Sequence, residues 1–597
     1  MSTAILTGQP VPGSPLEGDL RSLGFDVRVA SDAADAQTLL AAVPADQRVA
    51  VVDARFVGHV HALRLGLTDP RFATAAVPGA VTAKPEARKE LTSALRTTAG
   101  TTGGVVTLDA LPDLVASALE SADTDVHRPE LGTLVATVPS DPQTRNEARQ
   151  AVAAVDDEAV RLRTAVKSRD GFFTTYCISP YSRYIARWCA RRGLTPNQVT
   201  TASLLTALIA AGCAATGTRG GFVAAGLLLL FSFVLDCTDG QLARYSLQYS
   251  TLGAWLDATF DRAKEYAYYA GLALGAARGG DDVWALALGA MVLQTCRHVV
   301  DFSFNEANHD ATANTSPTAA LSDKLDSVGW TVWVRRMIVL PIGERWAMIA
   351  VLTAVTTPRV TLVVLIIGCA LAACYTTAGR VLRSLTRKAT RTDRAALALG
   401  ELADNGPLAS AFAALKRGRL PLPAPVTAFV GGAALVAVAA FTSYGSPWVV
   451  VAAVVYVITS GLALSRSLKA PLDWLVPPFF RAAEYGTVLV LAAKADVNGA
   501  LPAAFGLVAA VAYHHYDTVY RIKGGTGAPP RWLVRAIGGQ EGRTLVVALA
   551  AALLPTTDFT VALTALAVAV ALVVLVESIR FWVSSGAPAV HDEGEPA

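Results

Sequence analysis

Charged residues are scarce in this chain of 597 residues: 17% are charged and 53% are hydrophobic, and the mean hydropathy is +0.42. Such a composition excludes a wholly soluble protein. Positive and negative charges almost cancel, at a net charge of +3, so the charge balance gives no reason to expect nucleic-acid binding. The seven cysteines form no CxxC pair, which argues against a disulfide framework or a zinc site. The first residues, MSTAILTGQPVPG, lack a basic stretch followed by an apolar one, so no cleaved signal peptide is expected.

Long apolar stretches are abundant in the rest of the chain. They are long enough to cross a bilayer and recur from about residue 200 to residue 580, whereas the first 190 residues contain none. We therefore expect an α-helical polytopic membrane protein of about 12 spans, arranged as two six-helix units, behind an N-terminal soluble α/β domain. The spans are expected at 199–216, 221–244, 251–277, 283–303, 342–357, 360–384, 424–441, 447–465, 474–493, 499–521, 543–555 and 558–583.

The N-terminal region alternates short apolar runs with helical ones, a pattern typical of a small α/β layer fold with a largely parallel sheet. The strand-like runs are Thr3–Thr7, Asp26–Ala30, Arg48–Val52 and Gly104–Leu108. Asp53 follows one of these runs, where a ligand-binding carboxylate could lie, but a turn residue at a strand end is the favoured interpretation. The segment TGQPVPGSP lacks the basic residue and the spacing of a phosphate-binding loop.

Changes in composition set the expected domain boundaries. A polar helical stretch and a basic amphipathic segment precede the first span, and a second polar, basic segment follows the sixth. The basic segments all fall on one side if the chain starts inside, so the positive-inside rule predicts a cell (inner) membrane protein with a cytoplasmic N-terminus. The expected parts are 1–135 (soluble α/β domain), 136–194 (linker and juxtamembrane helix), 195–386 (first membrane unit), 387–420 (basic cytoplasmic connector), 421–585 (second membrane unit) and 586–597 (tail).

Four aspartates at the ends of two expected membrane helices form the main candidate site. In the segment LDCTDGQLARYSLQYSTLGAWLDATFDRAKEY, Asp236 and Asp239 are i,i+3 neighbours, and Asp257 and Asp261 are i,i+4 neighbours, so each pair shares one helix face. Carboxylates at membrane-helix ends are unfavourable unless they share cations, and hard oxygen ligands favour Mg²⁺ or Mn²⁺. Two helices that each carry a carboxylate pair could hold two such ions side by side. The expected orientation puts this active site on the cytoplasmic side.

The segment matches the spacing D-x2-D-G-x2-A-R-x8-G-x3-D-x3-D at every specified position, and residues 170–385 resemble the CDP-alcohol phosphotransferase (phosphatidyltransferase) family. The alternative, unrelated helix caps or interfacial charges, would need eight chance agreements. The resemblance implies that the first three aspartates ligate the cations and that Asp261 is the general base and also a ligand. It further implies a nucleotide site made by Gly240, Ala243, Arg244 and Gly253, with Pro196 and Asn197 shaping the pocket.

The resemblance predicts an integral membrane transferase. Such an enzyme moves a substituted phosphoryl group from a CDP-alcohol, of the CDP-diacylglycerol or CDP-inositol type, to an acceptor hydroxyl and releases CMP, in phospholipid or inositol-phosphate biosynthesis. The 170–200 stretch resembles the branch that uses inositol phosphate, an acceptor that needs a basic pocket. Lys264, Arg297 and Arg336 are the candidate acceptor contacts, although each alone also fits an inner-leaflet anchor.

In that branch a sugar-phosphate cytidylyltransferase domain often precedes the membrane part. Its Gly-rich LAAGxGxR-type loop is replaced here by ILTGQPVPGSPL. The N-terminal domain is therefore interpreted as a degenerate, non-catalytic relative or as a different α/β domain.

The second half of the chain echoes the first. TPNQVT resembles PAPVT, FDRAKEY resembles FFRAAEY, and RHVVDF resembles HHYDTVY, so that Val199 corresponds to Val426, Arg262 to Arg481 and Asp301 to Asp517. We therefore hypothesise an internal duplication that keeps the scaffold and lacks the metal ligands, because the four aspartates align with Ile458, Gly461, Val476 and Phe480. The histidines at helix ends are interpreted as interfacial residues rather than metal ligands: His298, His514 and His515.

Two other functions fit parts of the same pattern. Twelve spans in two similar halves also suit a transporter or a non-catalytic scaffold, although the acidic cluster occupies one half alone. The second half could instead be a dimerisation or partner-docking module. The expected partners are thus the CDP-alcohol donor, an alcohol or inositol-phosphate acceptor and the lipid bilayer, and the expected assembly is a homodimer or an internal pseudo-dimer.

Overall fold

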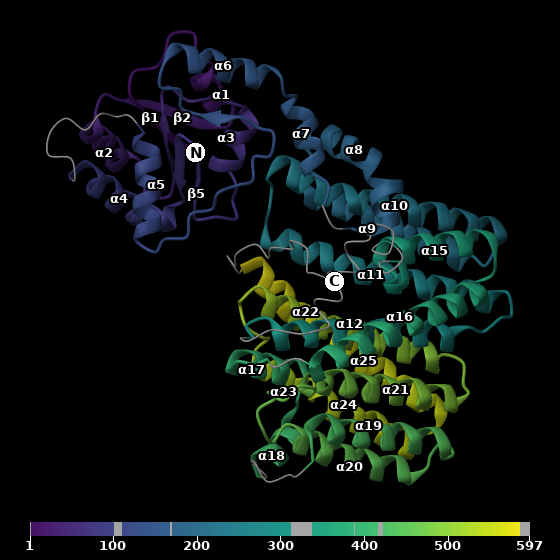
Figure 1. The fold of residues 1–597 in the computed structure, drawn as a ribbon. Helices are drawn as coiled ribbons and strands as arrows, with labels where there is room; N and C mark the ends of the chain where they lie inside the picture. The colour runs from purple at the N-terminus through teal and green to yellow at the C-terminus, as the bar shows by residue number, and fades with distance from the viewer. Residues whose placement is uncertain are drawn as a thin grey trace. The chain divides into compact units, whose positions relative to one another are not determined.

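The computed structural model describes residues 2–100, 110–167, 170–311, 333, 337–386, 389–415 and 422–584 (Figure 1). The chain divides into two compact units. The first comprises Met1–Ser168, Tyr181–Pro196 and Thr238–Tyr249, and the second comprises Arg169–Pro180, Asn197–Cys237 and Ser250–Ala597. The expected strand at Gly104–Leu108 and the expected tail at 586–597 lie outside the described residues.

A five-stranded sheet of order β2-β1-β3-β6-β5 forms the centre of the first unit. β1 (Ser2–Thr7) runs parallel to both β2 (Phe25–Ala30) and β3 (Arg48–Asp53), as the sequence pattern predicts. The expectation of a largely parallel sheet is wrong for the other edge, where β6 (Ala80–Ala83) is antiparallel to β3 and to β5 (Thr74–Val77). The reason is the two-residue turn Pro78–Gly79, which is far too short for a parallel crossover and uses the φ of +78° at Gly79.

Two apolar layers cover this sheet, because successive strand residues point to opposite faces. Ile5 of β1 packs in one layer with α2 (Ala33–Ala42), α4 (Arg88–Gly100) and α5 (Leu111–Ser121). Leu6 packs in the other layer with α1 (Leu16–Ser22) and α3 (Val60–Leu67). Asp53 ends β3 and accepts hydrogen bonds from the backbone N–H of Arg55 at 2.8 Å and from its guanidinium at 2.9 Å, as expected for a strand-end turn residue.

The polar linker is helical, as predicted. A two-stranded pair, β4 (Val57–Gly58) and β7 (Ala136–Thr137), precedes α6 (Pro142–Ala153) and α7 (Asp157–Thr164). The Asp141 side chain caps α6 by accepting from the backbone N–H groups of the first turn at 2.9 Å. α8 (Ser179–Arg191) exposes a row of aromatic side chains beside its arginines, which fits the predicted amphipathic juxtamembrane helix: Tyr181, Tyr184 and Trp188.

The second unit is built from long helices, and every expected span corresponds to one of them. The helices matching the first six spans are α9 (Pro196–Ala215), α10 (Arg219–Ser246), α11 (Thr251–Arg278), α12 (Trp284–Asn308), α15 (Ile342–Val355) and α16 (Pro358–Thr386). Two shorter helices follow, α17 (Asp393–Leu402) and α18 (Pro407–Leu415). The helices matching the last six spans are α19 (Ala424–Phe441), α20 (Pro447–Ala463), α21 (Val476–Ala495), α22 (Ala500–Lys523), α24 (Gly539–Leu553) and α25 (Thr556–Ser584), with the short α23 (Arg531–Ala536) before α24.

Five of the described helices are long and apolar enough to cross a membrane: α9, α10, α16, α19 and α25. α20 is apolar but shorter. Charged residues inside α11, such as Lys264 and Glu265, and inside α21, such as Arg481 and Glu484, lower the hydropathy of these helices, although all four side chains are buried. The count of 12 spans therefore stays a prediction, whereas five apolar helices in a mostly helical chain support a multi-pass membrane protein.

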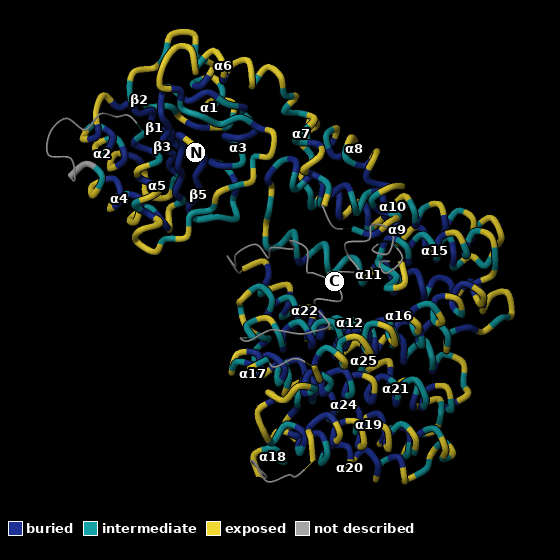
Figure 2. Tube along the Cα trace, viewed as in Figure 1, coloured by how far each residue is buried: buried dark blue, intermediate teal, exposed yellow. Residues whose placement is uncertain are grey.

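Many helix positions are exposed (Figure 2), and several of them carry large apolar side chains. On α25 these residues recur at helical spacing and form one stripe: Val561, Val568, Leu572, Val576 and Val583. A stripe of this kind is unfavourable in water and favourable against lipid. On the inner side helices approach closely, because a Cβ atom at Gly271 of α11 would collide with the carbonyl oxygen of Ala211 in α9.

Candidate metal centre

Two helices supply the acidic residues of the candidate site. The apolar body of α10 ends at Leu235, and Asp236 follows directly. α11 begins after Ser250, whose hydroxyl accepts a hydrogen bond from the backbone N–H of Gly253 at 3.0 Å. This cap fixes the start of α11 and therefore the helix face on which Asp257 and Asp261 lie, one turn apart.

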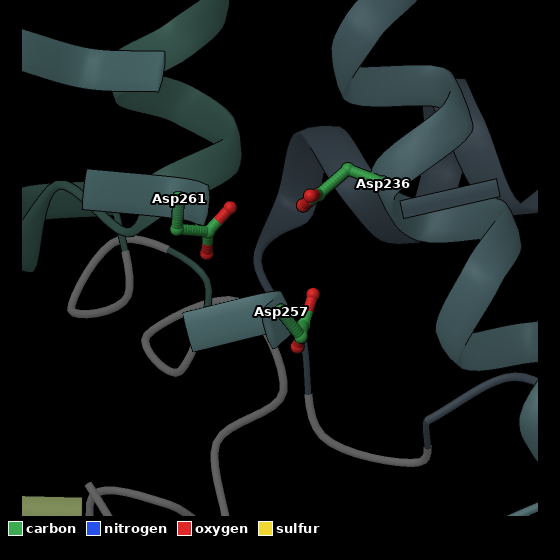
Figure 3. Close-up of side chains that lie close together, drawn as sticks. All are labelled: Asp236, Asp257 and Asp261. Atoms are coloured by element: carbon green, nitrogen blue, oxygen red, sulfur yellow. The ribbon is translucent and has the colours of Figure 1, made fainter. Parts of the chain in front are cut away.

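Three of the four predicted aspartates converge. Asp236, Asp257 and Asp261 each offer one carboxylate oxygen, and these oxygens all lie within 4.8 Å of one another. Figure 3 shows the three carboxylates around a common space, Asp236 from α10 and the other two from α11. Two oxygens that ligate one Mg²⁺ at 2.0–2.1 Å lie at most about 4 Å apart. The three carboxylates are therefore close to the spacing that a shared divalent cation requires, and hard oxygen donors fit Mg²⁺ or Mn²⁺.

Asp239 is buried one turn after Asp236 on α10. It belongs to the segment Thr238–Tyr249 of the first unit and is not part of the group of three. Its role as a fourth ligand stays a prediction.

A lysine lies inside the acidic cluster. Lys264 is fully buried, and its ammonium nitrogen lies 2.9 Å from Asp261 Oδ1 and is also paired with Asp236. The same nitrogen donates to the hydroxyl of Ser203 at 3.2 Å. Lys264 is therefore the counter-ion of two candidate metal ligands, since a buried charge requires a partner of opposite sign. The sequence pattern assigns Lys264 to the acceptor pocket, and that role stays a prediction.

An ion network on the same helix was missed by sequence reasoning. Arg262 Nη1 donates to Glu265 Oε2 at 3.0 Å, and Arg345 Nε of α15 lies 3.0 Å from Glu265 Oε1. Arg262 also lies beside Asp261, with 4.0 Å between Nη2 and Oδ2. The available signal was the presence of charged residues within an apolar helix, because such residues need partners.

The predicted nucleotide-site residues occupy the starts and ends of these helices. A Cβ at Gly253 would lie 2.7 Å from Asn197 Oδ1 and 2.8 Å from Ser250 Oγ, so a larger residue here would displace these two side chains. A Cβ at Gly240 would meet the Arg244 guanidinium at 3.5 Å, which is an ordinary contact. Arg244 Nε donates to the carbonyl oxygen of Ala165 at 2.6 Å. The two remaining predicted residues lie on α10 and in the first turn of α9: Ala243 and Pro196.

The other predicted basic and polar residues are placed as follows. Arg297 of α12 is buried and donates to the backbone carbonyl of Val339. Arg336 lies outside the described residues. The interfacial interpretation is wrong for His514 and His515, which are buried at 1% and 2% exposure because they pack inside the helical unit. His514 Nε2 lies 3.2 Å from Asp404 Oδ1.

Comparison with known proteins supports the family resemblance. Residues 193–374 match the family model described as CDP-alcohol phosphatidyltransferase, and residues 393–597 match a family of unknown function, DUF5941. Phosphatidylinositol phosphate synthase of Streptomyces avermitilis is 33% identical over 130 residues, which cover 21% of this chain and 51% of that protein. Archaetidylinositol phosphate synthase of Pyrococcus horikoshii is 31% identical over 113 residues, 19% of this chain and 58% of that protein.

A third relative is a bifunctional IPC transferase and DIPP synthase of Aquifex aeolicus, 32% identical over 114 residues, 19% of this chain and 26% of that protein. The chain thus spans about half the length of the first relative and less of the third. The predicted resemblance is confirmed for the matched segment. The matched family is generally dependent on divalent metal ions, which agrees with the carboxylate cluster.

Proposed function

We propose that this chain, whose residues 193–374 match the CDP-alcohol phosphatidyltransferase family, is an integral membrane phosphotransferase. It takes a CDP-alcohol, transfers the substituted phosphoryl group to an acceptor hydroxyl and releases CMP. One observation carries the proposal: three carboxylates from two helices of the matched segment converge within 4.8 Å.

The four aspartates have different roles in the proposed reaction. Asp236, Asp239 and Asp257 would hold two divalent cations, Mg²⁺ or Mn²⁺, together with Asp261. Bound there, the cations would neutralise charge on the donor phosphates and on the leaving CMP. Asp261 accepts the proton of the acceptor hydroxyl as the new oxygen–phosphorus bond forms and the bond from phosphorus to the CMP oxygen breaks. Lys264, 2.9 Å from Asp261, balances the charge of that carboxylate when no cation is bound.

The inositol-phosphate branch supplies the proposed substrates. The names of the relatives from Streptomyces and Pyrococcus both refer to inositol phosphate products. We infer a CDP-diacylglycerol or CDP-inositol type donor and an inositol-phosphate type acceptor, within phospholipid or inositol-phosphate biosynthesis. Lys264, Arg297 and Arg336 stay the candidate acceptor contacts, although the contacts of Lys264 favour a role toward the carboxylates.

The membrane arrangement follows from the basic segments. We propose 12 spans in two six-helix units, with the N-terminus and the active site on the cytoplasmic side of the cell membrane. We also propose the six parts with the boundaries expected from the sequence, and an N-terminal domain that is non-catalytic. The proposed assembly is a homodimer or an internal pseudo-dimer.

Release of CMP from a panel of labelled CDP-alcohols, with and without Mg²⁺, tests the activity. Asp261→Asn should lower turnover at least 100-fold, because a general base contributes about 10²–10⁴-fold. Asp558→Asn, which alters an exposed carboxylate of α25, is the matched control and should leave turnover unchanged. Equal turnover of Asp261→Asn and the control would contradict the assignment of the base.

A further inference from the structure

The helical unit contains a buried ion network in its first half, formed by Arg262, Glu265 and Arg345. Nη1 of Arg262 lies 3.0 Å from Oε2 of Glu265, and Nε of Arg345 lies 3.0 Å from Oε1 of the same carboxylate. One arginine comes from the same helix three residues earlier, and the other comes from the start of α15. Arg345 also donates through Nη2 to Oε2 at 3.2 Å, so this carboxylate is bound by both arginines.

The second half contains a corresponding network, formed by Arg481, Glu484 and Arg543, in which Asp404 between α17 and α18 also pairs with both arginines. Nη1 of Arg481 lies 2.7 Å from Oε2 of Glu484, and Nε of Arg543 lies 2.7 Å from Oε1. Again one arginine precedes the glutamate by three residues, on α21, and the other comes from the start of α24. Because burying charges is unfavourable without complete pairing, two independent origins for the same atomic arrangement are improbable.

A second feature repeats beside each network. Glu344, next to Arg345, accepts a hydrogen bond from the backbone N–H of Phe173 at 3.3 Å. Glu541, two residues before Arg543, accepts from the backbone N–H groups of Gly406 at 3.0 Å and Ala409 at 3.1 Å. In each half a glutamate in the first turn of a helix thus caps the start of an earlier segment.

The neighbouring helices of the two halves also occur in the same order. α9 begins at Pro196 and α19 begins at Ala424. α10 and α20 begin at Arg219 and Pro447, which are as far apart in the sequence as the starts of α9 and α19. α16 and α25 are both 29 residues long, and their starts, at Pro358 and Thr556, lie closer together in the sequence. Helices that pair in this way indicate that the second half repeats the first, with a shorter connection before α24 than before α15.

The repeat lacks the acidic cluster. Glu265 aligns with Glu484, so the positions of Asp257 and Asp261 are taken by Val476 and Phe480, which are fully buried and apolar. The position of Lys264 is taken by Ala483. α20, which corresponds to α10, contains no acidic residue. The carboxylates and their lysine counter-ion are thus absent together, which agrees with their forming one site in the first half.

The repeat touches the helix that carries the acidic pair at both ends of that pair. Trp582 of α25 stacks on Trp255, two residues before Asp257, with ring centroids 6.0 Å apart. Tyr516 of α22 places its ring 5.6 Å from the guanidinium of Arg262, next to Asp261. The Tyr516 hydroxyl also lies 2.5 Å from Nδ1 of His298 on α12.

We propose that the C-terminal half, from α17 to α25, is a catalytically silent copy of the first membrane unit, and that it acts as a built-in partner that positions α11. It holds Trp255 and Arg262 so that the carboxylates between them face Asp236. This assigns a role to the segment that matches the family of unknown function. The positioning role rests on the cation site of the proposed function, whereas the origin as a copy does not.

Trp582→Ala in the full-length protein tests the positioning role, with Leu572→Ala, an exposed residue of the same helix, as the matched control. Trp582→Ala should weaken Mn²⁺ binding, measured by electron paramagnetic resonance, at least tenfold. It should also lower kcat for CMP release at least tenfold and change KM for the donor less than threefold. Trp582→Phe should restore both quantities to within threefold of the wild type, because it keeps an aromatic ring against Trp255.

Tyr516→Phe provides a second variant that removes one hydroxyl group and leaves the packing in place. It should lower Mn²⁺ affinity two- to fivefold through the lost contact with His298. If both variants bind Mn²⁺ as tightly as Leu572→Ala, the positioning role is overturned. If the wild type releases CMP from no donor while Trp582→Ala still weakens Mn²⁺ binding, the proposed activity fails and the positioning role stands.

A protease site introduced at positions 387–388 of the full-length protein tests whether the two halves stay associated without a covalent connection. After cleavage the two pieces should stay together through size exclusion in detergent and should keep at least half of the Mn²⁺ binding. Separation of the pieces with undiminished Mn²⁺ binding would overturn the proposal, because the first half would then need no partner.

Discussion

Replacing Lys264 by methionine removes a lysine that the structure places between two candidate metal ligands. The ammonium is fully buried and pairs with Asp236 and Asp261, whose side chains keep 13% and 16% exposure. Removing one partner of a buried ion pair costs about 3–5 kcal/mol, and the partial exposure of the carboxylates favours the lower end of this range. We therefore expect the metal-free protein to lose about 3 kcal/mol of unfolding free energy.

The same substitution should strengthen metal binding. Like charges about 4 Å apart repel by about 4 kcal/mol at an effective dielectric constant near 20, so a divalent cation at the cluster competes with the ammonium. Even if most of this energy is offset by lost order among the carboxylates, we expect Mn²⁺ to bind at least tenfold more tightly, equivalent to about 1.4 kcal/mol. Metal addition should then raise the unfolding temperature of the variant more than that of the wild type.

Mn²⁺ titration followed by electron paramagnetic resonance, together with thermal unfolding with and without Mn²⁺, measures both effects. Lys494→Met is the matched control, because Lys494 lies in the last turn of α21 and donates to the neutral carbonyl oxygen of Thr442. Weaker Mn²⁺ binding in Lys264→Met than in the control would contradict competition between the ammonium and the cation. It would show that the ammonium organises the cation site instead. Equal stability of the two metal-free variants would also contradict it.

Two further predictions concern the start of α11 and the first unit. Gly253→Ala should lower kcat/KM for CMP release at least tenfold, because a Cβ there would lie 2.7 Å from Asn197 Oδ1; Gly212→Ala, which meets open space, should change it little. Burial, followed by the charges of Arg161 and Arg64, lowers the pKa of His61 from 6.5 to about 4, so the stability that neutral His61 contributes is complete above pH 6.5 and is lost as the pH falls toward 4. The first unit should thus lose about 2 kcal/mol between pH 7.5 and pH 5, measured by hydrogen exchange, and a His61→Phe variant with the same loss would contradict this origin.

The sequence pattern predicts the site better than it predicts the contacts around it. The spacing of Asp257 and Asp261 predicts that they share one helix face, because helical pitch decides which residues of a helix lie together. Their approach to Asp236 depends on how α10 and α11 pack. The partner of Lys264 was missed, since an i,i+3 lysine can turn to either side of its helix and its final contact depends on α10 packing beside it. Arg345 lies 80 residues from Glu265, and pairing over that separation leaves no periodic signal in a single sequence.

For the fold as well, the sequence predicts the helices better than it predicts how neighbouring elements pair. Every predicted span corresponds to a helix, because long apolar runs bounded by polar residues specify helices strongly. The strand direction at one edge of the N-terminal sheet was missed, since it depends on the turn at Pro78–Gly79, which is too short for a parallel crossover. The proposed internal repeat was suggested by short motifs, and the paired arginine–glutamate contacts of α11 and α21 agree with it.

Anomalous diffraction from crystals of the full-length protein grown with Mn²⁺ would show whether the carboxylate cluster binds two cations. We expect two anomalous peaks about 3.5–4 Å apart, the separation typical of two-metal sites, each within bonding distance of carboxylate oxygens from Asp236, Asp257 or Asp261. Mn²⁺ peaks elsewhere in the protein, with Lys264 still bound to both aspartates and no peak at the cluster, would contradict the proposed cation site.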